Sequence, residues 1–144
     1  MTIRRTSYIL GLILALAVML PVLHADEINQ ATKVTFSQPV EIPGKTLPAG
    51  TYWLDRGTAA DAVIVRVFNA DRSRLIATLL TISREKKDVA AHSTFILADQ
   101  GAGKPQALVA WFYPGNSIGH EFLYAKPERQ ELARDNKETV VAGD

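Results

Sequence analysis

Short apolar segments separated by turn-forming residues make up most of the chain after residue 31. The clearest is residues 62–68, a segment dense in the β-branched residues that favour strands. Two sets of side chains alternate along it: Val63, Val65 and Val67 in one, and Ile64, Arg66 and Phe68 in the other. Successive side chains of a strand point to opposite faces, so we expect the two sets on opposite faces of a sheet. Turn formers at residues 69–73 and a further apolar segment at 74–83 complete a predicted hairpin of two central strands.

The same pattern continues over residues 32–125, which we interpret as one β domain. Eight segments are expected to be strands: residues 32–36, 40–42, 51–56, 62–68, 74–83, 93–98, 107–113 and 121–124. Many short strands at this spacing are typical of all-β folds, so we predict an antiparallel sandwich or partly open barrel of about seven or eight strands. Residues 126–144 are expected to form a short C-terminal helix and a tail, because Pro127 suits a first helical position.

The first 25 residues have the organisation of a secretory signal peptide. Arg4 and Arg5 precede an uninterrupted apolar run at residues 8–20, and Ala25 stands directly before a polar segment. The run is shorter than the roughly 20 residues that a membrane-spanning helix needs. We therefore expect cleavage after Ala25, export to the periplasm or the extracellular space, and no membrane span in the mature chain. Residues 26–31 are expected to be a flexible lead-in.

Composition narrows the classes of partner. The chain holds 16 basic and 15 acidic residues without a basic run, which argues against nucleic acid as a partner. It has no cysteine, so the exported domain is expected to depend on its apolar core rather than on disulfides.

Two motifs resemble catalytic sites but lack the context that the chemistry requires. Ser117 lies in a G-x-S-x-G segment after an expected strand, yet the only later histidine, His120, is three residues away and leaves no room for a triad. His120 also begins an H-E-x-x-H-like segment in which Tyr124 replaces the second histidine. We therefore expect no catalytic residue, no metal site and no cofactor.

Arg66 has two interpretations, because it lies in the middle of the most apolar strand. It could be a receptor for an anion or carboxylate inside a pocket. Alternatively, it lies on an exposed face with its aliphatic stem over apolar neighbours.

Half of the aromatic residues beyond residue 25 fall within residues 111–124: Trp111, Phe112, Tyr113, Phe122 and Tyr124. Alternation places Trp111 and Tyr113 on one face and Phe112 on the other. One set could form a surface platform for recognition, with Trp111 or Tyr113 at its centre and His120 and Glu121 at its rim. Alternatively, both sets are buried between packed layers.

Several segments together resemble a family of small exported β-rich proteins from environmental bacteria. They read LPAGTY from Leu47, WFYPG from Trp111 and GHEF from Gly119, and the likeness covers about residues 32–125. The resemblance implies a single exported β domain. It implies no activity, cofactor or catalytic residue.

Three functions remain open. We favour a non-enzymatic binding or structural module of the cell envelope or secretome, with an envelope protein, a glycan or a small ligand as its partner. A small-ligand carrier with a barrel-like pocket is the second, and a small hydrolase is the third. An enclosed apolar cavity would favour the carrier, and an exposed aromatic patch would favour the binding module. A group of titratable side chains that converge on one site would favour the enzyme.

Overall fold

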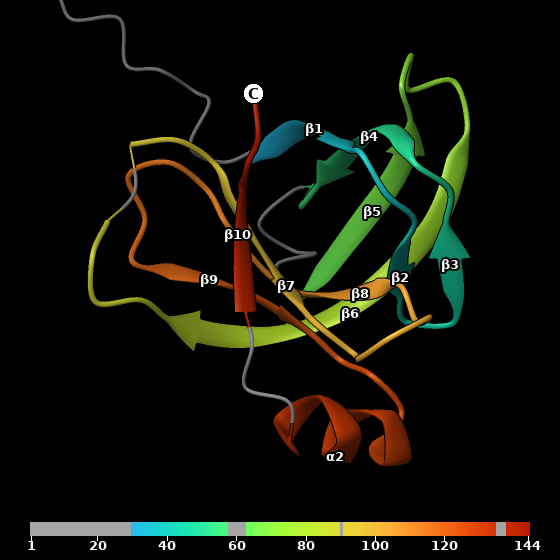
Figure 1. Ribbon diagram of the computed structural model, residues 1–144. Helices are drawn as coiled ribbons and strands as arrows, with labels where there is room; N and C mark the ends of the chain where they lie inside the picture. The colour runs from blue at the N-terminus through green and yellow to red at the C-terminus, as the bar shows by residue number, and fades with distance from the viewer. Residues whose placement is uncertain (1–29, 58–62, 90, 135–137) are drawn as a thin grey trace, which may run out of the picture.

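The computed structural model describes residues 30–57, 63–89, 91–134 and 138–144. This part of the chain forms strands and one short C-terminal helix, which confirms the all-β class (Figure 1). The elements are β1 (Ala31–Phe36), β2 (Val40–Ile42), β3 (Lys45–Leu47), β4 (Gly50–Asp55), β5 (Ile64–Asn69), β6 (Leu75–Glu85), β7 (Thr94–Ala98), β8 (Gln106–Phe112), β9 (Ile118–Phe122), α2 (Lys126–Arg134) and β10 (Glu138–Ala142). The expected signal peptide lies outside the described residues.

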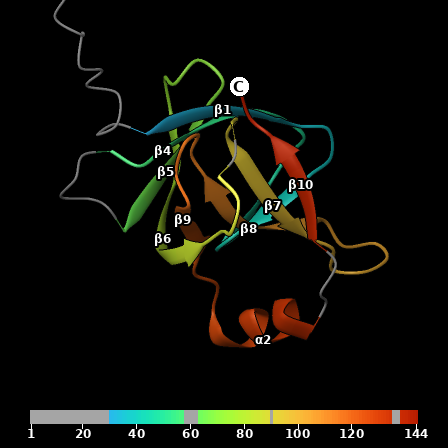
Figure 2. The same cartoon turned by 90° about the vertical axis from the view of Figure 1, so that its left-hand side faces the viewer.

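All ten of these strands belong to one strongly curved sheet. Its strand order is β1-β4-β5-β6-β9-β8-β2-β3, and β7 pairs with both β8 and β10. Every pairing is antiparallel except the one between β2 and β8. The curvature brings the C-terminus beside β1, where the backbone N–H of Asp144 donates to the carbonyl of Lys33 at 2.9 Å (Figure 2). The sheet stays open, and its concave side encloses the core.

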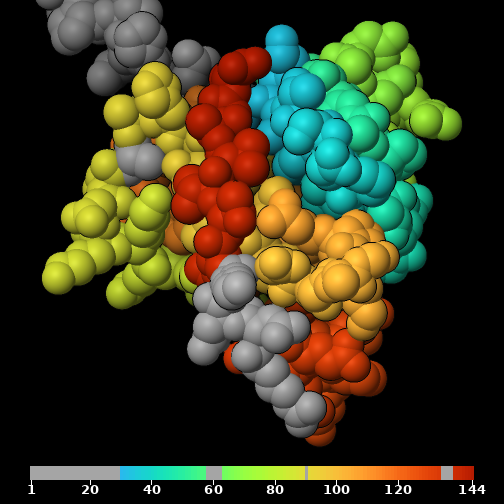
Figure 3. Space-filling view, viewed as in Figure 1, coloured from blue at the N-terminus to red at the C-terminus, as the bar shows by residue number. Residues whose placement is uncertain are grey.

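Two strands fall where the sequence predicted none. β3 pairs back onto β2, in a segment for which no strand was expected. β10 replaces part of the expected tail and pairs along β7, while its own side chains stay largely exposed (Figure 3). Backbone hydrogen bonds to β7 therefore hold β10 in place. A strand held in this way does not need alternating apolar side chains, so its sequence carries no pattern from which it could be predicted.

The alternation predicted for residues 62–68 is present within β5, but Val63, which was expected on the face of Val65 and Val67, precedes the strand and is 58% exposed. Val65 and Val67 are fully buried, whereas Arg66 is partly exposed on the convex face. Inside the sheet, aromatic rings form a continuous series in which each ring packs on the next: Tyr52, Phe36, Phe95 and Trp111. The last pair is stacked in parallel, with centroids 6.2 Å apart.

A β-bulge in β8 decides which of its side chains reach the core. Ile96 pairs with Ala110 and Leu97 with Leu108, so Val109 has no partner across the ladder. Leu108 therefore points into the core together with Trp111, three residues later. Phe112 is also buried, in a second small cluster with Ile96 and Ala110. Trp111 and Phe112 are thus both buried, in two separate clusters.

Gly119 lets β9 lie close against β8. A Cβ at this position would be 2.5 Å from Cδ1 of Phe112 and 2.6 Å from the carbonyl oxygen of Trp111. Any side chain here would therefore push the two strands apart. His120 is the next residue of β9, so the close approach at Gly119 also sets the distance of His120 from β8.

Candidate functional site

A pocket of about 270 Å³ opens between the end of β4, the second half of β6 and the start of β9. Its polar lining consists of Gln30, Arg56, Thr81, Ser83, Asn116 and His120. We call it the Arg56–His120 pocket. Thr81 pairs with Phe122 and Ser83 with His120 across the β6–β9 ladder, so the pocket continues the concave, core-facing side of the sheet.

Arg56 brings a cation to this pocket. It follows directly on β4, where its backbone N–H donates to the carbonyl of Gln30 at 2.9 Å. Its side chain is half-buried, and among the described residues its Nε has no hydrogen-bond partner although it is shielded from solvent. The ion pairs within the described ranges involve other arginines: Arg66, Arg72 and Arg84. Arg56 therefore brings to the pocket a positive charge that no carboxylate in the described ranges neutralises.

His120 is held in one orientation by the strand beside it. Its Nδ1 lies 3.2 Å from Oγ1 of Thr81, and that hydroxyl also donates to the carbonyl of Val63 at 3.1 Å. Burial lowers the pKa of His120 below its ordinary value, and the charge of Arg56 lowers it further. The imidazole is therefore neutral near pH 7, and the pocket combines a cation with a neutral ring.

The predicted surface platform does not form around Trp111. Trp111 is fully buried in the core on the concave side of the sheet. This corrects our expectation that Trp111 could be exposed for recognition, and it agrees with the alternative that its side chain is buried. Its ring packs against Tyr113 edge-on at 6.5 Å and against His120 at 5.6 Å. Trp111 therefore packs against the core-facing side of His120, a residue that lines the pocket. Its Nε1 is also buried without a partner in the described part of the chain.

Glu121 is adjacent to His120 in sequence but lies on the opposite face of β9. Its carboxylate is 4.0 Å from Nε of Arg84. The Nη2 atom of the same arginine donates two hydrogen bonds of 3.2 Å to the carboxylate of Glu138. These three residues line a separate groove of about 410 Å³ beside α2. The structure therefore does not bring Glu121 and His120 to one site.

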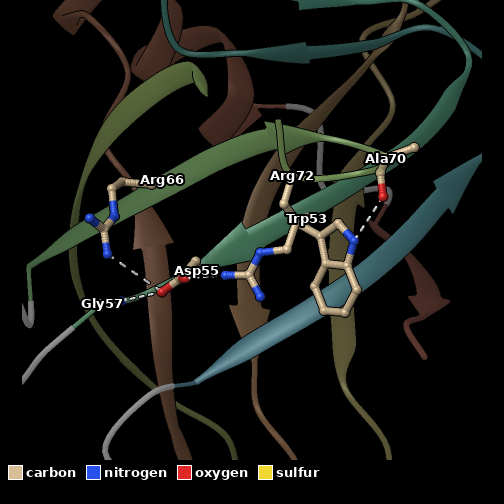
Figure 4. A network of polar contacts seen from close by, with 6 residues as sticks. All are labelled: Trp53, Asp55, Gly57, Arg66, Ala70 and Arg72. Carbon is tan, nitrogen blue, oxygen red and sulfur yellow. Dashed lines mark hydrogen bonds and ion pairs between the residues drawn. The ribbon is translucent and has the colours of Figure 1, made fainter. Parts of the chain in front are cut away.

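Arg66 lies on the convex face in a network with Asp55 (Figure 4). The guanidinium groups of Arg66 and Arg72 flank the Asp55 carboxylate, which also accepts from the backbone N–H of Gly57. Arg72 in turn stacks over Trp53, 4.9 Å from its ring centroid. Arg66, 39% exposed in its side chain, already has a carboxylate partner at 3.7 Å and lines neither pocket.

The other sequence motifs add no chemistry in the described residues. Ser117 is exposed at the turn before β9, and its carbonyl accepts from the backbone N–H of Lys86. Within the described ranges there is no group of three or more histidine, aspartate or glutamate residues able to hold a metal ion. No helix among the described residues is long and apolar enough to cross a membrane.

The sequence interpretation missed Arg56, Thr81 and Gln30. Arg56 lies between Asp55 and Gly57, and all three are ordinary residues for the end of a strand. Gln30 and Thr81 reach the site only through strand pairing. No local pattern marks any of the three.

Comparisons with protein-family models, curated proteins and solved structures found no match to this chain.

Proposed function

We propose that this chain is an exported, non-enzymatic binding module that takes a small molecule with an anionic group into the Arg56–His120 pocket. One observation carries the proposal: the half-buried side chain of Arg56 lines a pocket of about 270 Å³ and makes no ion pair within the described residues. A carboxylate or similar oxyanion would accept hydrogen bonds from the exposed part of this guanidinium and neutralise its charge. Export follows from the signal-peptide organisation of residues 1–25.

The size and lining of the pocket favour a small ligand over an envelope protein or a glycan. One water occupies about 30 Å³ in the liquid, so the pocket holds a ligand of roughly nine heavy atoms. Two side chains at its rim are apolar, Val63 and Ile118, which are exposed by 58% and 57%. These side chains suit a short branched hydrocarbon attached to the anionic group.

The alternatives have less support. A carrier would need an enclosed apolar cavity, whereas aromatic rings fill the concave side of the sheet. A hydrolase of the serine type would need a histidine beside Ser117. In the described part of the chain, the Nδ1 of His120 is instead directed at Thr81.

Calorimetry with 3-methylbutyrate and its neutral amide tests the proposal on protein purified after expression of the full chain. We expect the acid to bind more tightly than the amide. Arg56→Gln should weaken binding of the acid by about tenfold or more, because a hydrogen bond to a charged group contributes about 1.5–3 kcal/mol.

Arg66→Gln is the matched control, since Arg66 is an arginine whose charge is already paired. It should leave the affinity for the acid unchanged. Equal binding of acid and amide, or equal loss in both variants, would contradict the proposal.

A further inference from the structure

The hydrogen bonds of Thr81 determine which nitrogen of His120 carries the proton. A hydroxyl has one proton, and the Thr81 hydroxyl directs it to the carbonyl of Val63, because a carbonyl can only accept. Oγ1 of Thr81 must then accept from His120, so the proton of the neutral ring is on Nδ1. The Nε2 atom is left as a lone-pair acceptor, and no residue in the described ranges donates to it.

The pocket therefore offers two different hydrogen-bonding groups to a ligand. Arg56 supplies N–H donors and a positive charge, whereas Nε2 of His120 supplies an acceptor. A plain carboxylate satisfies only the first of these groups. A ligand that also carries a hydroxyl satisfies both, because an O–H can donate to Nε2.

Resting on the function proposed above, we infer that the ligand is a small hydroxy carboxylic acid. Its carboxylate pairs with Arg56 and its hydroxyl donates to Nε2 of His120. Its hydrocarbon part lies toward the apolar side chains of Val63 and Ile118. Arg56 and His120 line the same pocket, so one small ligand can contact both side chains.

Calorimetry with a matched pair of probes tests this inference at pH 7.5, where His120 is neutral. The probes are 2-hydroxy-3-methylbutyrate and 3-methylbutyrate, which differ only by the hydroxyl. We expect the hydroxy acid to bind about fivefold more tightly, because one neutral hydrogen bond contributes about 1 kcal/mol. His120→Phe should abolish this difference while 3-methylbutyrate still binds, and its binding shows that the variant is folded.

His92→Phe is the control, since His92 is exposed and lies outside the pocket. It should keep the preference for the hydroxy acid. Equal binding of the two acids to the wild-type protein, or a preference that persists in His120→Phe, would overturn the inference and leave the anion site standing. Absence of binding for both acids would overturn the proposed function itself.

Discussion

The imidazole of His120 packs against the indole of Trp111, with the ring centroids 5.6 Å apart and the planes inclined by 32°. Trp111 stacks in turn on Phe95 in the core. The Arg56–His120 pocket is thus built directly on the aromatic core of the sheet. Substitutions in the core should therefore affect both the stability of the fold and the site.

Trp111→Ala should destabilise the protein by about 3–5 kcal/mol, because it removes a fully buried indole and leaves a cavity. Trp53→Ala is the matched control. Trp53 is half-buried on the convex face, where it donates to the carbonyl of Ala70 and stacks under Arg72. Its replacement by alanine should therefore lower the free energy of unfolding by only about 1 kcal/mol. Urea unfolding followed by circular dichroism measures both values. A similar loss in the two variants would place Trp111 outside the core.

Gly119→Ala should destabilise the protein by about 1–3 kcal/mol, since the added methyl group collides with Phe112 and with the backbone of Trp111. The same collision should displace His120 and weaken binding at the pocket. Ser117→Ala alters an exposed residue in the turn just before β9 and should stay within about 0.5 kcal/mol of the wild type. An unchanged unfolding midpoint in Gly119→Ala would refute the close approach of β9 to β8.

Much of the fold follows from sequence because strand alternation is local. Val65 and Val67 lie on the core side and Arg66 on the other, as their spacing predicts. Alternation fails at β8, where the unpaired Val109 lets Leu108 and Trp111 face the same side. A bulge depends on the neighbouring strand, so the sequence of β8 alone does not reveal it.

The candidate site was harder to predict for a related reason. Gln30, Arg56, Thr81 and His120 are far apart in the chain and meet only when β6 pairs with β9 and the start of β1 lies beside the end of β4. Their residue types are common at strand ends. His120 was selected from the sequence, but its neighbour Glu121 is directed to the other face of β9.

The stability of the protein should fall as the pH decreases below about 6.5, the ordinary pKa of histidine. The pKa of His120 is lower than this in the folded protein because of burial and the charge of Arg56. The unfolded chain therefore binds more protons in this window, and stability is lost as the pH falls through the folded-state pKa. Urea midpoints between pH 5 and 7.5 measure the slope. The slope should be smaller in His120→Gln than in the wild type, and equal slopes in the two proteins would contradict this role.

The mature protein should begin at Asp26, because Ala25 is the small residue directly before the polar segment. Intact mass spectrometry of the protein recovered from the exported fraction measures this. Ala25→Arg should block processing and leave the chain in the membrane fraction. Recovery of a full-length soluble wild-type protein would refute the signal peptide.

The guanidinium Nε–H resonances of the arginines report on the anion site individually. In a titration of the wild-type protein with 3-methylbutyrate, the Arg56 resonance should shift in a saturable way, and the ring resonances of His120 should shift with the same dissociation constant. The resonances of Arg66 and Arg72 should stay constant, because Asp55 already pairs with both. A non-saturable shift of Arg56, or equal shifts of all three arginines, would show that the pocket holds no specific anion site.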